Sequence, residues 1–279
     1  MLRLIWLECF KIIKKPRSYI GFAAITVIVT LIQVALLADG DEYISFILQS
    51  LEQSFLVEGK LLNGYLVCFI ILQTLIVQMP LLVALVTGDL VSGEAAAGTL
   101  RLLLTRPFSR TQIIIAKWLS GAIYTFILLC WLGALALGVS LMLFGEGDLM
   151  VLKNDALVIL RSNDVLWRYI TALSLAFLSL LTVATFSLML SCLSDNSIGP
   201  IVSAMAVIIL FTIIGSLDVP LFDKIKPFLF TTHMIIWRNM FDSPVPLQQI
   251  IISISVLVVH ITIFLSFSLI YFRTKDIYT

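Results

Sequence analysis

The sequence has little charge, and none of that charge lies inside its long hydrophobic runs. Only 13% of the 279 residues are Asp, Glu, Lys or Arg, whereas 60% are hydrophobic. This balance excludes an ordinary soluble globular domain. A helix needs about 20 mostly apolar residues to cross a bilayer, and six uncharged runs of that length occur. The six runs cover residues 18–37, 61–86, 118–144, 169–190, 198–217 and 249–272.

The same runs lack the alternation of polar and apolar residues that marks a transmembrane β-strand. Backbone groups in lipid must be hydrogen-bonded within the spanning structure, so only helices and closed barrels cross a bilayer. We therefore expect an all-α integral membrane protein, a single transmembrane domain over residues 1–279 with six transmembrane helices. Residues 145–168 are expected to form a loop on the outer side.

Motifs for nucleotide, metal or hydrolytic chemistry are missing. The sequence has no G-x-x-x-x-G-K-[ST] loop, and its one Gly-Lys pair, Gly59-Lys60, is followed by Leu61. The chain by itself therefore cannot cradle nucleotide phosphates in the usual way. It has no H-E-x-x-H motif, and its four cysteines form no C-x-x-C pair, which argues against a zinc site. We expect no enzyme activity, no metal site and no bound cofactor.

Carboxylates are also missing from the hydrophobic runs, although ion-driven carriers usually bury them near the membrane midplane. Pro80 is a candidate kink in the second run. Four polar residues, Gln73, Gln78, Thr182 and His260, could line a translocation path, or could form hydrogen bonds between helices. An ion-coupled secondary transporter or a channel that acts alone remains an alternative function, which ion flux through liposomes containing only this chain would reveal.

Lys and Arg are distributed unevenly between the two sides of the membrane. If the N-terminus is inside, residues 1–17, 88–117 and 273–279 hold 11 of the 18 Lys and Arg residues. An excess of Lys and Arg marks the cytoplasmic side, so both termini are predicted to be cytoplasmic in a multi-pass topology. The net charge of +1, without a continuous basic patch, argues against a nucleic-acid partner.

Two segments outside the runs are amphipathic or strongly apolar. Residues 1–17 place Arg3, Glu8 and Lys11 on one side of a helix and apolar residues on the other, which predicts an interfacial helix ended by Pro16. Residues 218–248 include an apolar aromatic stretch that is too short to span and is bounded by prolines. They predict short re-entrant or interfacial helices on the outer side.

Residues 88–117, GDLVSGEAAAGTLRLLLTRPFSRTQIIIAK, form a charged loop between the second and third runs. The stretch EAAAGTLRLLL is capable of forming a short helix with Leu100, Leu103 and Leu104 on one face. Ser109 and Gln112 form an S-x-x-Q capping box that would start the third transmembrane helix. The leucine ridge either packs on the protein's own inner face or offers a docking surface to a soluble partner.

This loop resembles the E-x-x-x-G-T-L…L-L…P-x-S-R…K signature of the ABC-2 type transporter permeases, the membrane subunits of a class of ABC transporters. The resemblance extends over essentially the whole chain, because that family also has an interfacial helix, six spans and short outer helices before the last span. One departure is Ala at positions 95–97, where relatives often have acidic residues. The matching residues are Glu94, Gly98, Thr99, Leu100, Leu104, Pro107, Ser109, Arg110 and Lys117.

The resemblance implies a permease subunit that couples ATP hydrolysis by a separate subunit to transport, usually export. Two copies of the ATPase would bind ATP and Mg, and a second permease would complete a homodimer or heterodimer. The location implied is the cytoplasmic (inner) membrane of a bacterium, with lipid and an extracytoplasmic protein as further partners. The residues implied for the ATPase-coupling interface are Glu94, Gly98, Thr99, Leu100, Arg101, Leu103, Leu104, Ser109 and Arg110.

Overall fold

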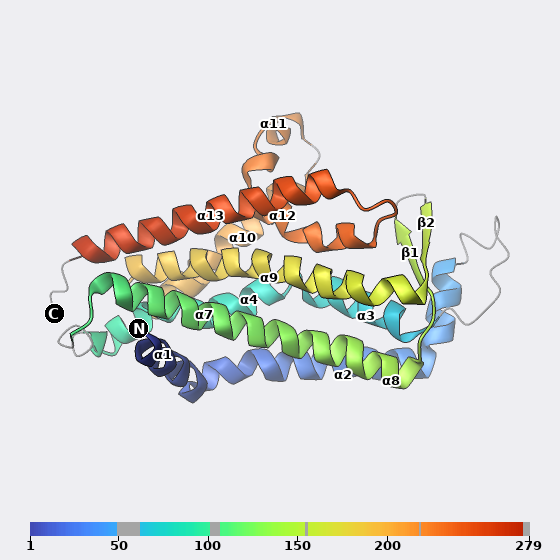
Figure 1. Ribbon diagram of the computed structural model, residues 1–279, viewed down its shortest axis with the longest axis horizontal. Helices are drawn as coiled ribbons and strands as arrows, with labels where there is room; N and C mark the ends of the chain where they lie inside the picture. Colours follow the sequence, from blue (N-terminus) through green and yellow to red (C-terminus); the bar gives the residue numbers. More distant parts are fainter. Residues whose placement is uncertain (49–61, 101–106, 154–155, 218, 276–279) are drawn as a thin grey trace.

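The computed structural model describes residues 1–48, 62–100, 107–153, 156–217 and 219–275. In this part of the chain, long helices lie side by side in an elongated bundle (Figure 1). Five of them are long and apolar enough to cross a membrane, which supports an all-α membrane protein. They are α2 (Pro16–Leu48), the helix that starts with α7 (Arg110–Gly133), α9 (Ser162–Leu193), α10 (Gly199–Ser216) and α13 (Leu247–Thr274).

The second hydrophobic run forms two helices instead of one. α3 (Gly64–Leu75) and α4 (Met79–Thr87) are bent by 52° at a short break, and together they would make a sixth span. Pro80 lies at the start of α4, where its missing N–H is tolerated because the first N–H groups of a helix have no partner within the helix. Proline does not allow a straight helix to continue from α3 into α4, because it lacks the N–H and its ring clashes with the preceding turn. The prediction of a kink at Pro80 is confirmed.

The N-terminal segment forms the helix α1 (Leu2–Lys14), and Glu8 of its predicted polar side is buried in the protein. Leu4, Glu8 and Ile12, one turn apart, are buried, whereas Leu2 and Trp6 on another side are exposed. Lys15 is extended and α2 begins at Pro16, so proline separates the two helices. The sharp elbow between α1 and α2 follows from this arrangement (Figure 1).

The third transmembrane helix begins at Arg110, two turns before its hydrophobic run at residue 118. The predicted capping box is confirmed: the Ser109 hydroxyl accepts from the Gln112 N–H at 3.2 Å, and the Ser109 N–H donates to Gln112 Oε1 at 3.0 Å. The helix continues through a π-helical stretch, η1 (Ala134–Val139), into α8 (Ser140–Phe144).

The connections at the end of the bundle away from the termini contain regular secondary structure. β1 (Leu149–Lys153) and β2 (Ala156–Leu160) pair antiparallel, which corrects the expectation of an irregular loop over residues 145–168. The Val and Ile residues of these strands have high strand propensity, which a search for apolar runs does not consider. Further on, four short helices precede α13: α11 (Pro220–Asp223), η2 (Lys226–Phe228), α12 (Phe230–His233) and η3 (Met234–Phe241).

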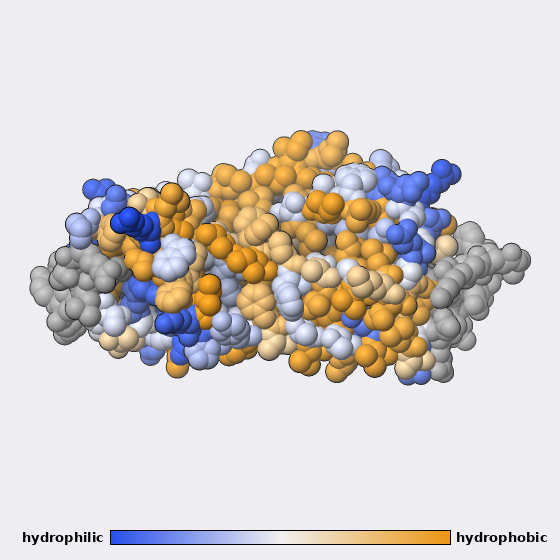
Figure 2. All heavy atoms as spheres, turned by 60° about the horizontal axis from the view of Figure 1, so that its bottom comes forward, coloured by the Kyte–Doolittle hydropathy of each residue, from blue (hydrophilic) through white to orange (hydrophobic). Residues whose placement is uncertain are grey.

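Apolar side chains cover much of the surface along the bundle, and polar side chains gather toward its ends (Figure 2).

Both termini lie at the same end of the bundle, together with the connection from α4 to α7 (Figure 1). We call this the termini end. Arg110 fastens α7 to the last turn of α13 here, because its guanidinium donates to the Lys275 carbonyl at 2.6 Å.

Candidate functional site

Four charged side chains form a closed ring at the termini end. Lys117 of α7 contacts Glu8 Oε2 of α1 and Glu94 Oε2 of the loop after α4, each at 2.9 Å. Lys11 contacts the other oxygen of each carboxylate, Glu8 Oε1 at 2.6 Å and Glu94 Oε1 at 2.7 Å. We call these four residues the charge ring. Its two positive and two negative charges alternate, so every charge has two opposite neighbours.

Three of the four side chains in the charge ring are largely buried. The Lys117 side chain is 0% exposed, and Glu8 and Glu94 are 2% and 10% exposed. An ammonium group of this kind is buried only when opposite charges and hydrogen bonds replace water. Lys117 donates hydrogen bonds to Glu8 Oε2 at 2.9 Å and to the Leu90 carbonyl at 2.8 Å, and its contact with Glu94 Oε2 is an ion pair. The ring therefore ties α1, α7 and the loop together.

Glu94 and Lys11 of the ring keep their charges over the neutral pH range. Burial alone would raise the pKa of Glu94, but Lys117 and Lys11 outweigh it and hold that pKa below its ordinary value of 4.5. Burial alone would lower the pKa of Lys11, but hydrogen bonds to Glu8 and Glu94 leave it above 10.5. Both shifts favour the charged forms.

We expect the stabilising contribution of Glu94 to disappear only in acid. Because its folded pKa is depressed, that contribution is complete above the unfolded pKa, about 4.3, and is lost as pH falls through the folded value. The difference in melting temperature between wild type and Glu94→Gln in detergent should be constant from about pH 6 to 9 and shrink below about pH 4. A difference that shrinks between pH 6 and 9 instead would contradict the ionised ring.

A second cluster surrounds Asp89, which is 4% exposed. Its carboxylate accepts from Lys15 Nζ at 2.7 Å and Arg17 NH1 at 3.1 Å, and from the hydroxyl of Ser197. A Cβ at Gly93 would stand 2.7 Å from Asp89 Cγ, so only glycine leaves room for the carboxylate. The cluster joins the elbow between α1 and α2 to the connections that follow α4 and α9.

The helix that carries Glu94 ends abruptly at a glycine. α5 (Ser92–Ala96) is followed by Gly98 with φ of +68°, in the left-handed region. The Gly98 N–H donates to the Ala95 carbonyl and the Thr99 N–H to the Glu94 carbonyl, both at 3.0 Å. These two bonds define a Schellman motif. The stretch EAAAGTLRLLL is therefore not one continuous helix, because the chain turns at Gly98.

Gly98→Ala should destabilise the protein by about 1–2 kcal/mol, the cost of a left-handed non-glycine residue. Among the described residues, apart from the two chain neighbours of Gly98, no atom lies within 4 Å of the added Cβ, so the cost comes from backbone conformation. Gly138→Ala is the matched control, because its Cβ also meets open space and its φ is ordinary. Denaturant titration in mixed detergent micelles measures both changes. Equal effects of the two substitutions would contradict the role given to Gly98.

A groove of about 510 Å³ separates α1 from the loop after α4. Lys11, Lys14 and Lys15 line it from α1, while both glutamates of its lining, Glu8 and Glu94, are already paired within the charge ring. We call this the loop groove. The cations exposed at the groove favour a negatively charged partner. The remaining lining residues are Leu4, Leu7, Phe10, Gly93, Ala97 and Thr99.

The residues predicted for the coupling interface take different positions. Glu94 is a member of the charge ring, and Thr99 lines the loop groove. Leu100 is 3% exposed and packs in the protein's own core. Ser109 and Arg110 hold the start of α7, as described above. Gly98 ends α5, as described above, and the other three predicted residues, Arg101, Leu103 and Leu104, lie outside the described residues.

The four candidates for a translocation path lie on different helices. Gln73 and Gln78 flank the bend between α3 and α4, and both are exposed. Thr182 is buried in α9 and donates to the Leu178 carbonyl at 3.0 Å. His260 of α13 is half-buried, with Nδ1 2.8 Å from the Val256 carbonyl. No hydrogen bond joins any two of the four in the described part of the chain.

The partners of Glu94 were not predicted from the sequence. Glu8 and Lys11 were expected only to lie on the polar side of an amphipathic helix, and the ion pair between Asp89 and Lys15 was not expected. One signal was available: a carboxylate in the otherwise basic segment 1–17 and two more in the following inner loop indicate pairing with nearby lysines. Over the described ranges, no group of three or more His, Cys, Asp or Glu residues could hold a metal ion.

A comparison with protein families matches residues 24–278 to the family described as "Protein of unknown function (DUF2705)". A comparison with curated proteins gives no match. The matched segment begins within α2, so it includes Glu94 and Lys117 of the charge ring but not the two ring residues of α1.

Proposed function

Because the chain belongs to the DUF2705 family, whose description assigns no activity, we propose its function from the geometry of the termini end: it is the permease subunit of an ATP-driven transporter. A separate ATPase subunit would bind at the loop groove and push on the loop after α4. The expected result is transport across the cytoplasmic membrane, with export as the direction that the ABC-2 resemblance implies.

The observation that carries this proposal is the closed charge ring. Lys117 and Lys11 each bind both Glu8 and Glu94, so the loop cannot move without α1 and α7. A loop held in this way transmits a displacement to the membrane helices, whereas a loose loop would absorb it. Such a connection is what a subunit driven from the cytoplasm requires.

The loop groove supports the same proposal through its chemistry. It is open, contains apolar residues such as Leu7 and Phe10, and presents lysines without exposed carboxylates. A protein surface with acidic residues around an apolar anchor would fit this groove, because complementary charge guides association and burial of apolar area stabilises it. We propose that one ATPase subunit docks on each permease and that ATP and Mg bind only to the ATPase.

The exposed glutamines of the α3–α4 bend support a second permease subunit. Gln73 and Gln78 lie exposed within an otherwise apolar segment, although an amide group in contact with lipid tails has no hydrogen-bond partner. A second copy or a related chain would cover these amides and form a translocation path beside them. Cargo such as a lipid, an apolar peptide or a drug would fit walls of this composition.

Purification with a candidate ATPase tests the proposal. We expect the tagged permease, co-expressed with a candidate ATPase and extracted in mild detergent, to yield a complex with two copies of each. The complex in liposomes should hydrolyse ATP faster than the ATPase alone. Ion flux through liposomes that contain only this chain, together with a failure to bind the ATPase, would favour the carrier or channel and contradict the proposal.

A further inference from the structure

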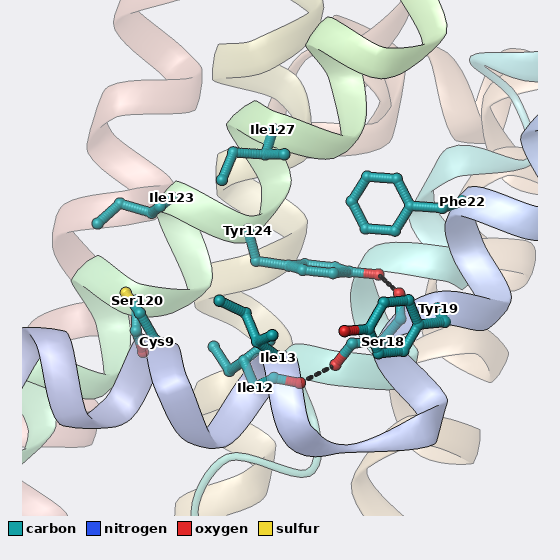
Figure 3. A pocket seen from close by; sticks show the side chains of 10 residues that line it. All are labelled: Cys9, Ile12, Ile13, Ser18, Tyr19, Phe22, Ser120, Ile123, Tyr124 and Ile127. Carbon is teal, nitrogen blue, oxygen red and sulfur yellow. Dashed lines mark hydrogen bonds between the residues drawn. The ribbon is translucent and has the colours of Figure 1, made fainter.

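An apolar cavity lies on the opposite side of α1 from the loop groove. Its volume is about 260 Å³, and it lies between α1, the first turns of α2 and the middle of α7 (Figure 3). The Tyr124 hydroxyl closes one side by donating to the Ser18 carbonyl at 3.2 Å. We call this the elbow cavity. Its main apolar walls are Ile12, Ile13, Phe22, Ile123, Tyr124 and Ile127.

The elbow cavity opens on the surface that would face lipid. Ile13 is 57% exposed, Ile123 is 41% exposed and Ile127 is 51% exposed, and these side chains border the cavity on two different helices. The volume is slightly below the range of about 300–1,000 Å³ that is typical of small-molecule pockets. The narrow space and apolar walls suit a single hydrocarbon chain.

The exposed surface of α1 continues from this opening to the edge of the loop groove, whose lining includes Phe10 and Lys14. At about 100° per residue, the side chains follow one another around the circumference of α1. Ile13 lies beside the cavity, Phe10 is next, and Lys14 is farthest from the cavity. Lys14 Nζ lies 4.7 Å from the centre of the Phe10 ring, and this lysine has no ion pair in the described part of the chain. Apolar contact followed by an unpaired cation matches a phospholipid tail followed by its phosphate.

We propose that the elbow cavity binds one acyl chain of an anionic phospholipid, with the phosphate beside Lys14. The tail enters between Ile13 and Ile127, and the glycerol region crosses the exposed face of α1 near Phe10. Because α1 also supplies Glu8 and Lys11 to the charge ring, a lipid that braces α1 also steadies the loop after α4. The lipid site itself requires no ATPase.

Photolabelling of the purified full chain in nanodiscs tests the site. The probes are phosphatidylglycerol and phosphatidylcholine, each with a diazirine in one acyl chain, at a low fraction in a phosphatidylcholine bilayer. We expect the phosphatidylglycerol probe to label the peptides of Ile13 and Ile127 about fivefold more than the phosphatidylcholine probe does, the effect of one cation beside an anionic lipid. Equal labelling by the two probes would overturn the proposal.

Two variants with matched controls locate the binding. Ile123→Trp should reduce labelling of the cavity to the level at α10, whereas Ile209→Trp, at an exposed position of α10, should leave it unchanged. Lys14→Glu should abolish the preference for phosphatidylglycerol, whereas Arg273→Glu at the termini end should keep it. The melting temperature confirms that each variant is folded. Loss of labelling in Ile209→Trp, or loss of the preference in Arg273→Glu, would overturn the proposal. So would persistent labelling in Ile123→Trp or a persistent preference for phosphatidylglycerol in Lys14→Glu.

Discussion

Lys117→Met should destabilise the protein by about 3–5 kcal/mol, the usual cost of removing one partner from a buried ion pair. The change leaves the Glu8 and Glu94 carboxylates, which are 2% and 10% exposed, facing each other without the fully buried cation. Lys11 remains but is 42% exposed, so water screens its attraction. Denaturant titration in mixed detergent micelles measures the loss of unfolding free energy.

Two controls separate the charge ring from ordinary effects of methionine. Lys224→Met changes an exposed lysine directly after α11 and should alter the unfolding free energy by less than about 0.5 kcal/mol. The triple variant Glu8→Gln, Glu94→Gln, Lys117→Met should recover part of the loss, because no buried charge is left unpaired. A Lys117→Met protein as stable as wild type would show that the ring does not bind the loop to α1 and α7.

Thr99→Trp should weaken binding of the ATPase at least about tenfold, equal to about 1.4 kcal/mol of binding free energy. Thr99 lines the loop groove, and a tryptophan there would occupy space that the proposed partner needs. The variant should still fold, because Thr99 is in an exposed turn and, among the described residues, its hydroxyl is bonded only to the Glu94 carbonyl, at 3.3 Å. Titration of purified ATPase onto the permease in nanodiscs measures the affinity.

Thr274→Trp is the matched control for this prediction. It places the same side chain on an exposed threonine at the termini end, outside the lining of the loop groove. We expect its ATPase affinity to equal that of wild type. If the two variants lost affinity equally, the surface at the termini end would matter but the loop groove would not be the docking site.

The membrane helices could be predicted from the sequence because lipid imposes a simple rule on length and polarity. The ends of those helices were less predictable. α7 begins at Arg110 and α9 at Ser162, ahead of the apolar runs at 118 and 169, because helices extend beyond the bilayer through polar first turns. For α7 the capping box at Ser109 supplied the correct start, since capping depends on local residues only.

The candidate site could be located from the sequence but not assembled. The motif around Glu94 indicated the loop that supplies one carboxylate of the charge ring, yet the partners of Glu94 are 83 and 23 positions away, at Lys11 and Lys117. Pairings at such separations depend on how the helices pack, and no local pattern encodes them. The burial of Leu100 could not be predicted for the same reason. The sequence allows the leucine ridge to face either the protein core or a partner, and helix packing decides between them.

Cross-linking from Thr99 tests the central claim most directly. A photoreactive amino acid replaces Thr99 in the loop groove or, as the comparison, Leu221, which is 71% exposed in α11 near the opposite side of the bundle from α1. In native membranes that contain the co-expressed ATPase, we predict a cross-link to the ATPase from position 99 and none from position 221. Capture of the ATPase only from position 221, or from neither position, would contradict a loop that ATP hydrolysis drives from the cytoplasm.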